Sequence, residues 1–317
     1  MTVSACLPAE PGTIHVIVTC TSRKTIPVPP VLRLDSIPGP STAQRARAWV
    51  SRLSGPYKAP VIEAERLYAG EHWMIARSLP GLAAERAVRL WVCSAGYGLM
   101  SAGAPVRPYA ATFSGRTDRV PGGPGGARQW WHALAGWEGP EPGQPRSIAS
   151  LAASDPKACL LLALSASYLD ACRDDIAAAA AQVPDPDRLV LISAGARPSG
   201  PVAEAMVPAD AKLQAVLGGT RQALNVRIAA RLLSADIYGR AAASDYLGRL
   251  LSEQPPLRRY ERKKLTDGEV SEMISCRLAQ APETPASRML REFRDAGYAC
   301  EQQRFAQLHR AVTGIRP

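Results

Sequence analysis

Long hydrophobic segments are missing from this 317-residue sequence. No apolar run approaches the roughly 20 residues that a membrane-spanning helix needs. The N-terminus also has no charged region followed by an apolar one, which is the pattern of a secretory signal. With 46% hydrophobic and 21% charged residues, the composition is typical of a globular protein. We therefore expect a soluble, cytoplasmic protein with no membrane partner.

Motifs for metals and common cofactors are missing as well. The seven cysteines are scattered and include no C-x-x-C pair, which argues against a disulfide framework and against a zinc site. The four histidines have no metal-ligand spacing. Neither a Walker A motif nor G-x-G-x-x-G is present, so neither ATP nor NAD binding is indicated. We expect a mechanism without metal or cofactor.

Negative charge is in the minority, because 28 Asp and Glu face 38 Lys and Arg, for a net charge of +10. From Val216 onward, 17 Lys and Arg stand against 11 Asp and Glu, so +6 of the excess lies in the last third. A basic balance favours a polyanionic partner, most often nucleic acid. Considered alone, the charge is explained equally well by an arginine-rich, high-GC genome.

Four continuous apolar runs are present, and helical segments lie between them. Unbroken apolar runs are typical of strands that are covered on both faces, as in a parallel sheet. Strands that alternate with helices predict an α/β fold, a layered and mostly parallel sheet flanked by helices. The predicted strands are Ile14–Cys20, Leu90–Ser94, Cys159–Leu164 and Leu189–Ser193.

Between these strands, helices are expected in "STAQRARAWVSRL", with Ser41 or Thr42 as the cap, in "EHWMIARSL" and in "LAAERAVRL". One long helix is expected to follow the third strand, in "SASYLDACRDDIAAAAAQV". From Gly115 to Pro145 the chain is expected to be irregular, with a mobile "PGGPGG" beside three of the six tryptophans. A long loop of this kind is more often functional than not.

The last part of the chain is expected to be helical. "TDGEVSEMISCRLAQ" begins with Thr266 as the cap, and Glu269 completes a capping box. Two further helices are expected in "TPASRMLREFRDAG" and "CEQQRFAQLHRAV", and three short helices resemble a helix-turn-helix module. The alternative is a helical cap packed on the main domain. The predicted domains are residues 1–215 (α/β), 216–255 (helical extension) and 256–317 (basic DNA-binding module).

Each predicted strand ends in small hydroxyl or glycine residues, which include Ser22, Ser94, Ser165 and Ser193. Ligands of open α/β sheets bind at the carboxyl ends of the strands. We therefore expect these four serines to lie on one edge of one sheet. For Ser165, a helix cap is a sufficient explanation.

Aromatic residues follow the second strand, and Asp118 comes after them. Tyr97, Tyr109 and Phe113 offer ring faces on which a flipped base could stack, and a nearby carboxylate could activate water or stabilise a cationic sugar. For each ring taken alone, a place in the core is the more common role. For Asp118, a turn-capping role is equally common.

Four segments of the first third of the chain carry a family resemblance: "CTSRK", "LYAGEHW", "SAGYGL" and "PYAATFSGRTD". Together they resemble the YaaA-like group of α/β proteins, distant relatives of the uracil-DNA glycosylase superfamily and of the glycosylase-like domain of archaeosine synthase. The tail "SRMLREFRDAGYACEQQRF" is similar to the helical tails of bacterial phage-defence proteins with such a domain. Among these are glycosylases that excise glucosylated hydroxymethylcytosine.

The resemblance implies a DNA N-glycosylase that excises a modified base in anti-phage defence. Uracil is not expected as the substrate, because "LVLISAGARPSG" stands without a histidine where uracil-DNA glycosylases have a histidine-bearing loop. Asp118 is the expected acid/base or oxocarbenium-stabilising residue, with Asp35 as the next candidate. The other expected roles are pocket shape (Thr21, Ser22, Ser94, Gly96), base contact (Tyr97, Tyr109, Phe113) and phosphate contact (Arg23, Lys24, Arg288, Arg291).

Two other functions stay open at this point. A deazaguanine-type base-exchange enzyme would form a covalent intermediate, with Asp118 as a candidate for its site. A non-enzymatic DNA-binding stress protein of the YaaA type would bind DNA without producing abasic sites.

Overall fold

The computed structural model describes residues 12–83, 85–122, 125–256 and 261–314. The chain divides into two compact units, Met1–Pro255 and Pro256–Pro317. The division falls where the Pro255-Pro256 pair predicts a boundary. Each unit has its own cluster of buried apolar side chains.

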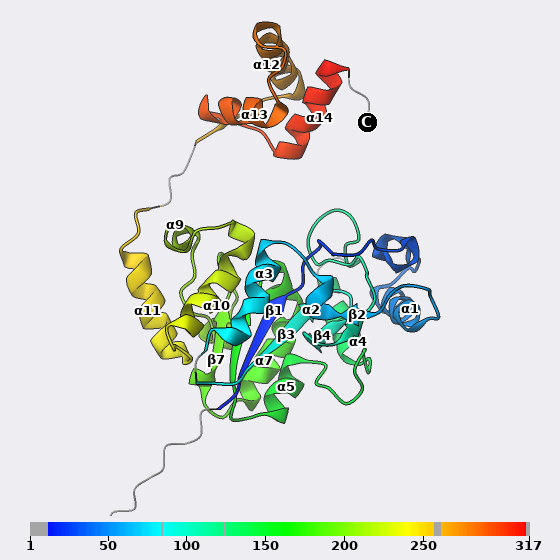
Figure 1. The fold of residues 1–317 in the computed structure, drawn as a ribbon, viewed down its shortest axis with the longest axis vertical. Coiled ribbons are helices and arrows are strands. Elements are labelled where there is room, and N and C mark those ends of the chain that lie inside the picture. The colour runs from blue at the N-terminus through cyan, green and yellow to red at the C-terminus, as the bar shows by residue number, and fades with distance from the viewer. Residues whose placement is uncertain (1–11, 84, 123–124, 257–260, 315–317) are drawn as a thin grey trace, which may run out of the picture. The chain divides into compact units, whose positions relative to one another are not determined.

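The first unit is an α/β structure built on a five-stranded sheet with the order β4-β3-β1-β6-β7 (Figure 1). The pairs β3–β1, β1–β6 and β6–β7 are parallel, and β4 pairs with β3 as an antiparallel hairpin. The predicted mostly parallel sheet is thus confirmed. The strands are β1 Ile14–Thr19, β3 Val88–Ser94, β4 Gly98–Ser101, β6 Cys159–Ala163 and β7 Leu189–Ile192, with a separate short pair β2 Ile62–Glu63 and β5 Pro105–Val106.

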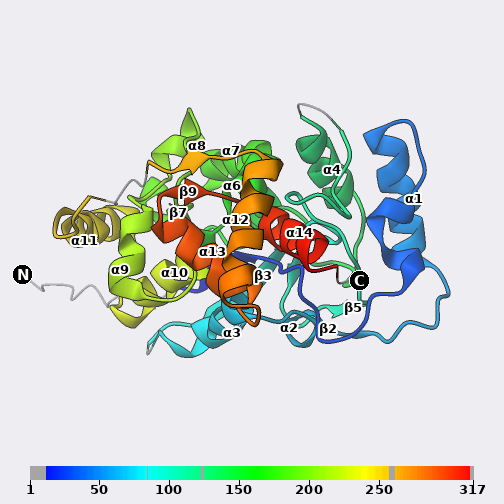
Figure 2. The same ribbon diagram turned by 90° about the horizontal axis from the view of Figure 1, so that it is seen from above.

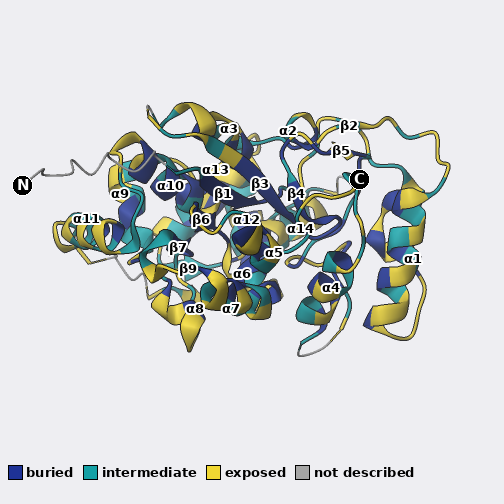
Figure 3. Cartoon of the chain, turned by 90° about the horizontal axis from the view of Figure 1, so that it is seen from below, coloured by how far each residue is buried: buried dark blue, intermediate teal, exposed yellow. Residues whose placement is uncertain are grey.

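Helices cover both faces of this sheet, which is why its strands are apolar without alternation. In Figure 3 the sheet lies between α3 and α10 on one side and α5 to α7 on the other, and Figure 2 shows α3 and α10 opposite α6 and α7. The helices of this unit are α1 Thr42–Ser54, α2 Ala64–Leu67, α3 Glu71–Ser78, α4 Gly126–Ala135, α5 Ile148–Ser154, α6 Ala166–Ala171, α7 Arg173–Gln182, α8 Pro201–Glu204, α9 Gln214–Leu217, α10 Leu224–Ser234 and α11 Arg240–Ser252.

Three local predictions are wrong. The expected helix in "LAAERAVRL" does not form, because Val88 and the residues after it pair with β1. The single helix expected after β6 is two helices, α6 and α7, which meet at Cys172. The segment expected to be irregular contains α4, whose Trp130 and Trp131 are buried. Residues 123 and 124 of "PGGPGG" lie outside the described residues.

The expected helical extension, residues 216–255, belongs to the first unit. Six residues of α10 are buried in the main core, and α10 contacts both β6 and β7. The amphipathic sequence of this helix therefore completes one face of the sheet, and it does not form a separate layer.

The second unit contains α12 Asp267–Gln280, α13 Ala286–Asp295 and α14 Gln302–Thr313, together with the short parallel pair β8 Lys263–Lys264 and β9 Tyr298–Ala299. The predicted capping box of α12 is confirmed, since the Thr266 side chain accepts a hydrogen bond from Glu269 N and the Glu269 carboxylate accepts one from Thr266 N. The core of the second unit is formed by eight buried residues: Leu265, Val270, Ile274, Met289, Leu290, Phe293, Cys300 and Phe305.

Candidate functional site at the carboxyl edge of the sheet

The four serines lie at the same edge of the sheet, as expected. Because β1, β3, β6 and β7 are parallel and in register, Ser22, Ser94, Ser165 and Ser193 all follow or end strands at their carboxyl side. Their exposure differs, however. Ser94 and Ser193 are fully buried, whereas Ser22 and Ser165 are exposed. Of the four serines, only Ser22 and Ser165 are therefore exposed to a ligand.

Ser94 is a structural residue of the β3–β4 hairpin. Its hydroxyl accepts hydrogen bonds from the backbone N–H groups of Gly96 (3.1 Å) and Tyr97 (2.9 Å), and it lies 2.6 Å from the Tyr109 hydroxyl. A Cβ atom at Gly96 would overlap the Tyr109 ring. The small residues after β3 therefore make the turn tight and leave space for this ring.

The three rings expected to stack on a base are packed inside the protein. Tyr97, Tyr109 and Phe113 are each 5% exposed or less. Tyr97 packs edge-on against Tyr109 with 5.2 Å between ring centroids, and Phe113 packs against Tyr168 at 4.9 Å. Because so little of their surface is exposed, none of the three rings offers a free face to a base in this structure.

Lys24 lies against two of the buried tyrosines. Its Nζ is 4.8 Å from the centroid of the Tyr68 ring and 4.6 Å from that of Tyr109, and it donates to the carbonyl of Thr21. The Tyr68 and Tyr109 hydroxyls are 2.9 Å apart, and the second of them contacts Ser94. We refer to Lys24, Tyr68, Tyr109 and Ser94 as the Lys24 cluster.

Backbone pairing holds this cluster together. Thr25 N donates to Leu67 O (2.8 Å), and Ala69 N donates to Arg23 O (3.0 Å). These bonds pair the segment after β1 with the segment between α2 and α3, which places Lys24 beside Tyr68. The segments "CTSRK" and "LYAGEHW", which are far apart in the sequence, thus meet at the same place.

The charge state of the cluster follows from burial. Desolvation lowers the pKa of Lys24 to about 8, and the nearby Cys20 opposes this shift. Lys24 takes part in no ion pair with a described residue. Burial raises the pKa of Tyr68 and of Tyr109 well above the usual value of a phenol. Near neutral pH the cluster therefore combines protonated phenols with an amine that deprotonates unusually easily.

The open side of the edge is basic. Ser22 and Arg23 are exposed beside the half-buried Thr21, and Ser165 and Arg197 are exposed at the ends of β6 and β7. In the part of the chain that the structure describes, the guanidinium groups of Arg23 and Arg197 form no hydrogen bond or ion pair. Two free cations and two hydroxyls favour an anionic ligand at this edge.

Asp118 links two loop segments through its carboxylate. It is 5% exposed, its carboxylate accepts a hydrogen bond from Arg33 Nη2 at 2.7 Å, and it also accepts one from Asp35 N at 3.2 Å. Its backbone is in the left-handed region, with φ 51°. Both carboxylate oxygens are engaged in joining two loop segments. Asp35, the next candidate, is exposed and contributes its backbone N–H to this link.

Several residues of this edge have no signal in the sequence. Asn225 on α10 accepts a hydrogen bond from Ala194 N (2.9 Å) and donates to Leu164 O (2.7 Å), which ties the ends of β6 and β7 together. His72 Nε2 lies 3.0 Å from Thr19 O, and burial lowers its pKa. No spacing predicts these contacts, because the partners come from distant segments.

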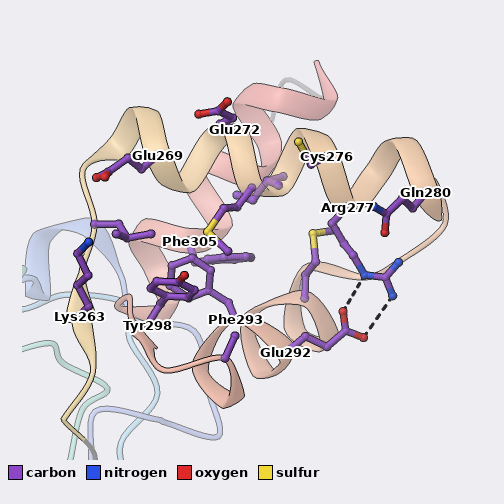
Figure 4. Close-up of a pocket in the computed structure, with 15 residues that line it drawn as sticks. Lys263, Glu269, Glu272, Cys276, Arg277, Gln280, Glu292, Phe293, Tyr298 and Phe305 are labelled. Atoms are coloured by element: carbon purple, nitrogen blue, oxygen red, sulfur yellow. Dashed lines mark hydrogen bonds and ion pairs between the residues drawn. The ribbon is translucent and has the colours of Figure 1, made fainter.

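The second unit has a groove of about 600 Å³ between its helices (Figure 4). Phe293, Tyr298 and Phe305 lie at its floor, and the exposed Cys276 lies on α12. The Arg277–Glu292 ion pair (2.8 Å) closes one end. Of the two arginines expected to contact phosphate, Arg288 pairs with Glu292 at 3.2 Å.

Arg291 of α13, the other arginine expected to contact phosphate, is exposed and pairs with no described residue. Among the described residues no group of three or more His, Cys, Asp and Glu is placed to hold a metal ion. In the same part of the chain, no helix has the length and apolarity to cross a membrane. No protein-family model, no curated protein and no solved structure matches the chain.

Proposed function

We propose that this protein is a DNA N-glycosylase that removes a modified base, glucosylated hydroxymethylcytosine being the first candidate, as part of a defence against phages. The observation that carries the proposal is the Lys24 cluster at the carboxyl edge of the sheet, in which an amine that has no acidic partner among the described residues lies on two protonated phenols. Excision of a base requires a polyanion to be held and a proton to reach the departing base.

The exposed residues at the carboxyl edge of the sheet would hold the polyanion. Arg23 and Arg197 carry charge that no described residue pairs, and Ser22 and Ser165 carry rotatable hydroxyl donors. Phosphate oxygens accept from such groups, and a nucleotide rotated out of a helix would meet them at the end of the sheet. Lys24 follows Ser22 and Arg23 directly in the chain.

The test compares three DNAs: unmodified, hydroxymethylated and glucosylated phage DNA. Each is incubated with the protein, and the products are examined for alkali-labile abasic sites and, by mass spectrometry, for released base. Release of base from one modified DNA, with none from unmodified DNA, would support the proposal. If no base is released from any of them, a glycosylase acting on these modified cytosines is ruled out.

A second candidate is a DNA-binding protein without catalytic activity. It is favoured by the burial of Tyr97, Tyr109 and Phe113 and by the ion pair of Asp118, because these leave neither an open base platform nor a free carboxylate. It predicts retained binding and unaltered DNA in the same assay. A base-exchange enzyme would instead incorporate a labelled free base, which an added labelled deazaguanine detects.

A further inference from the structure

We propose that the Lys24 amine is the nucleophile of the reaction and forms a covalent imine with the sugar of the excised nucleotide. The inference rests on the proposed function and deepens it, because it assigns the attacking atom to this chain and not to a water molecule. The atom that the amine attacks is C1′ of the deoxyribose, and the same imine can form on the C1′ aldehyde of an abasic site.

The geometry supports a reactive amine at this position. Lys24 Nζ is held by the Thr21 carbonyl and by the faces of Tyr68 and Tyr109, at 4.8 and 4.6 Å from the ring centroids. The groups that face it are these two phenols and the thiol of Cys20, and no carboxylate pairs with it in the described parts of the chain. A lysine in such surroundings keeps a neutral, nucleophilic fraction at working pH.

The segment around Lys24 is partly exposed: Lys24 itself is half-buried, and the residues before it, Ser22 and Arg23, are exposed. Lys24 therefore follows directly in the chain two residues that would bind a phosphate. Backbone bonds on both sides, Thr25 N to Leu67 O and Ala69 N to Arg23 O, fix the chain around it. A fixed backbone keeps the nucleophile aligned with the bound sugar.

The proposed step is balanced as follows. The lone pair of Nζ forms a bond to C1′ while the bond from C1′ to the base nitrogen breaks, and the electron pair leaves with the base. One proton of Nζ passes to the departing base. The bond from C1′ to the ring oxygen then breaks, a proton from solvent goes to that oxygen, and C1′ and Nζ become an iminium ion. Water hydrolyses the iminium and restores the lysine.

The alternative for Lys24 is a point charge that binds phosphate. An arginine can replace the lysine as a phosphate-binding charge but not as a nucleophile. Arg retains the charge and binds phosphate, but its guanidinium stays protonated and forms no imine. Lys24→Arg is therefore the informative variant, with Lys24→Gln as the variant that removes both charge and nucleophile.

The experiment uses the full chain and a synthetic oligonucleotide with one abasic site, in the presence of sodium cyanoborohydride. Hydride adds to C1′ of the iminium and leaves a stable amine, so a covalent protein–DNA adduct is expected, and peptide mass spectrometry should place it at Lys24. Lys24→Arg and Lys24→Gln should reduce the adduct to the level of the no-reductant control. Lys58→Arg, at an exposed lysine, should trap as the wild type does.

The pH profile gives a test without any substitution. Because burial lowers the pKa of Lys24 to about 8, adduct formation should rise from pH 6.5, reach half of its maximum near pH 8 and level off about one unit higher, whereas an exposed lysine would still be gaining reactivity there. An adduct at another lysine, equal trapping by Lys24→Arg, or a rate that still rises about tenfold per unit above pH 9 would each overturn the inference. The adduct site and the pH profile are measured on the wild type and do not depend on the variants, and circular dichroism checks that Lys24→Arg and Lys24→Gln are folded.

The two proposals fail separately. Base release by the wild type without any adduct would retain the glycosylase and replace the lysine by water as the nucleophile. An adduct at Lys24 with abasic DNA, but no base released from any modified DNA, would retain the reactive amine and reject the excision of these bases.

Discussion

Asp118 adopts a backbone conformation that few residues other than glycine tolerate, and Asp and Asn are among those few. Asp118→Asn keeps this tolerance but removes the charge that pairs with Arg33. We expect it to lower the free energy of unfolding by about 1–3 kcal/mol. Asp118→Ala should cost more, because alanine also loses the acceptor for Asp35 N and fits the left-handed region poorly. Urea denaturation measures both.

Asp245→Asn, at an exposed position of α11, is the matched control and should leave the unfolding curve unchanged. The rate of base release per folded molecule should survive Asp118→Asn. A variant as stable as the wild type that has lost base release would return Asp118 to the catalytic role that the sequence suggests.

At Gly96, the space available for a side chain determines how a substitution affects stability. Its φ is ordinary, but an added Cβ would meet the ring of the fully buried Tyr109. Gly96→Ala should therefore lower the free energy of unfolding by about 1–3 kcal/mol through overpacking. Gly103→Ala, which adds a methyl group on the exposed β4–β5 connection, should change it by less than about 0.5 kcal/mol. Equal melting temperatures for the two variants would contradict this account.

At the scale of single elements, the cap of α12 can be measured separately. Thr266→Ala removes the hydroxyl that accepts from Glu269 N and should cost the helix about 1 kcal/mol. Amide hydrogen exchange in the full chain should show faster exchange along Asp267–Gln280. Ser275→Ala, whose hydroxyl only bonds back to Ser271 O inside the same helix, is the control and should leave the exchange rates nearly unchanged.

The elements show what a sequence can and cannot predict. The four parallel strands follow from their unbroken apolar runs, and their common edge follows from the topology. The hairpin strand β4 is missed because Gly98–Ser101 continues the apolar stretch of β3 with only a glycine turn between them. Helix α4 is missed because "PGGPGG" precedes it and hides the apolar periodicity that follows.

Part of the candidate site could also be predicted from the sequence and part could not. Its location at one edge of the sheet was predictable, because parallel strands bring their carboxyl ends to the same edge. The burial of the rings was not, because it depends on Trp49 and Trp130 from distant helices. These donate hydrogen bonds to the carbonyls of Gly96 and Ala95, at 2.7 and 2.8 Å, and close the turn after β3. Lys24 was named only as a phosphate contact, since no local pattern indicates that two tyrosines surround it.

For the whole molecule, the net charge of +10 predicts binding to DNA that weakens steeply with salt. The slope of log affinity against log salt should be about −0.9 per phosphate contacted. Removal of residues 256–317 at the unit boundary should reduce both affinity and slope, because it removes cations such as Arg291, which pairs with no described residue. Fluorescence anisotropy with a labelled duplex measures this, and circular dichroism confirms that the first unit stays folded. Affinity that is independent of salt would contradict a charge-driven interaction.

The exposed thiol of Cys276 makes the second unit open to chemical labelling. The other five described cysteines are buried, and burial raises the pKa of Cys93, Cys159, Cys172 and Cys300, so these thiols react slowly. With Cys6, which lies outside the described residues, replaced by serine, a maleimide dye should attach at Cys276 alone. Because Cys276 lines the groove of that unit, the fluorescence of the attached dye would change when a molecule enters the groove.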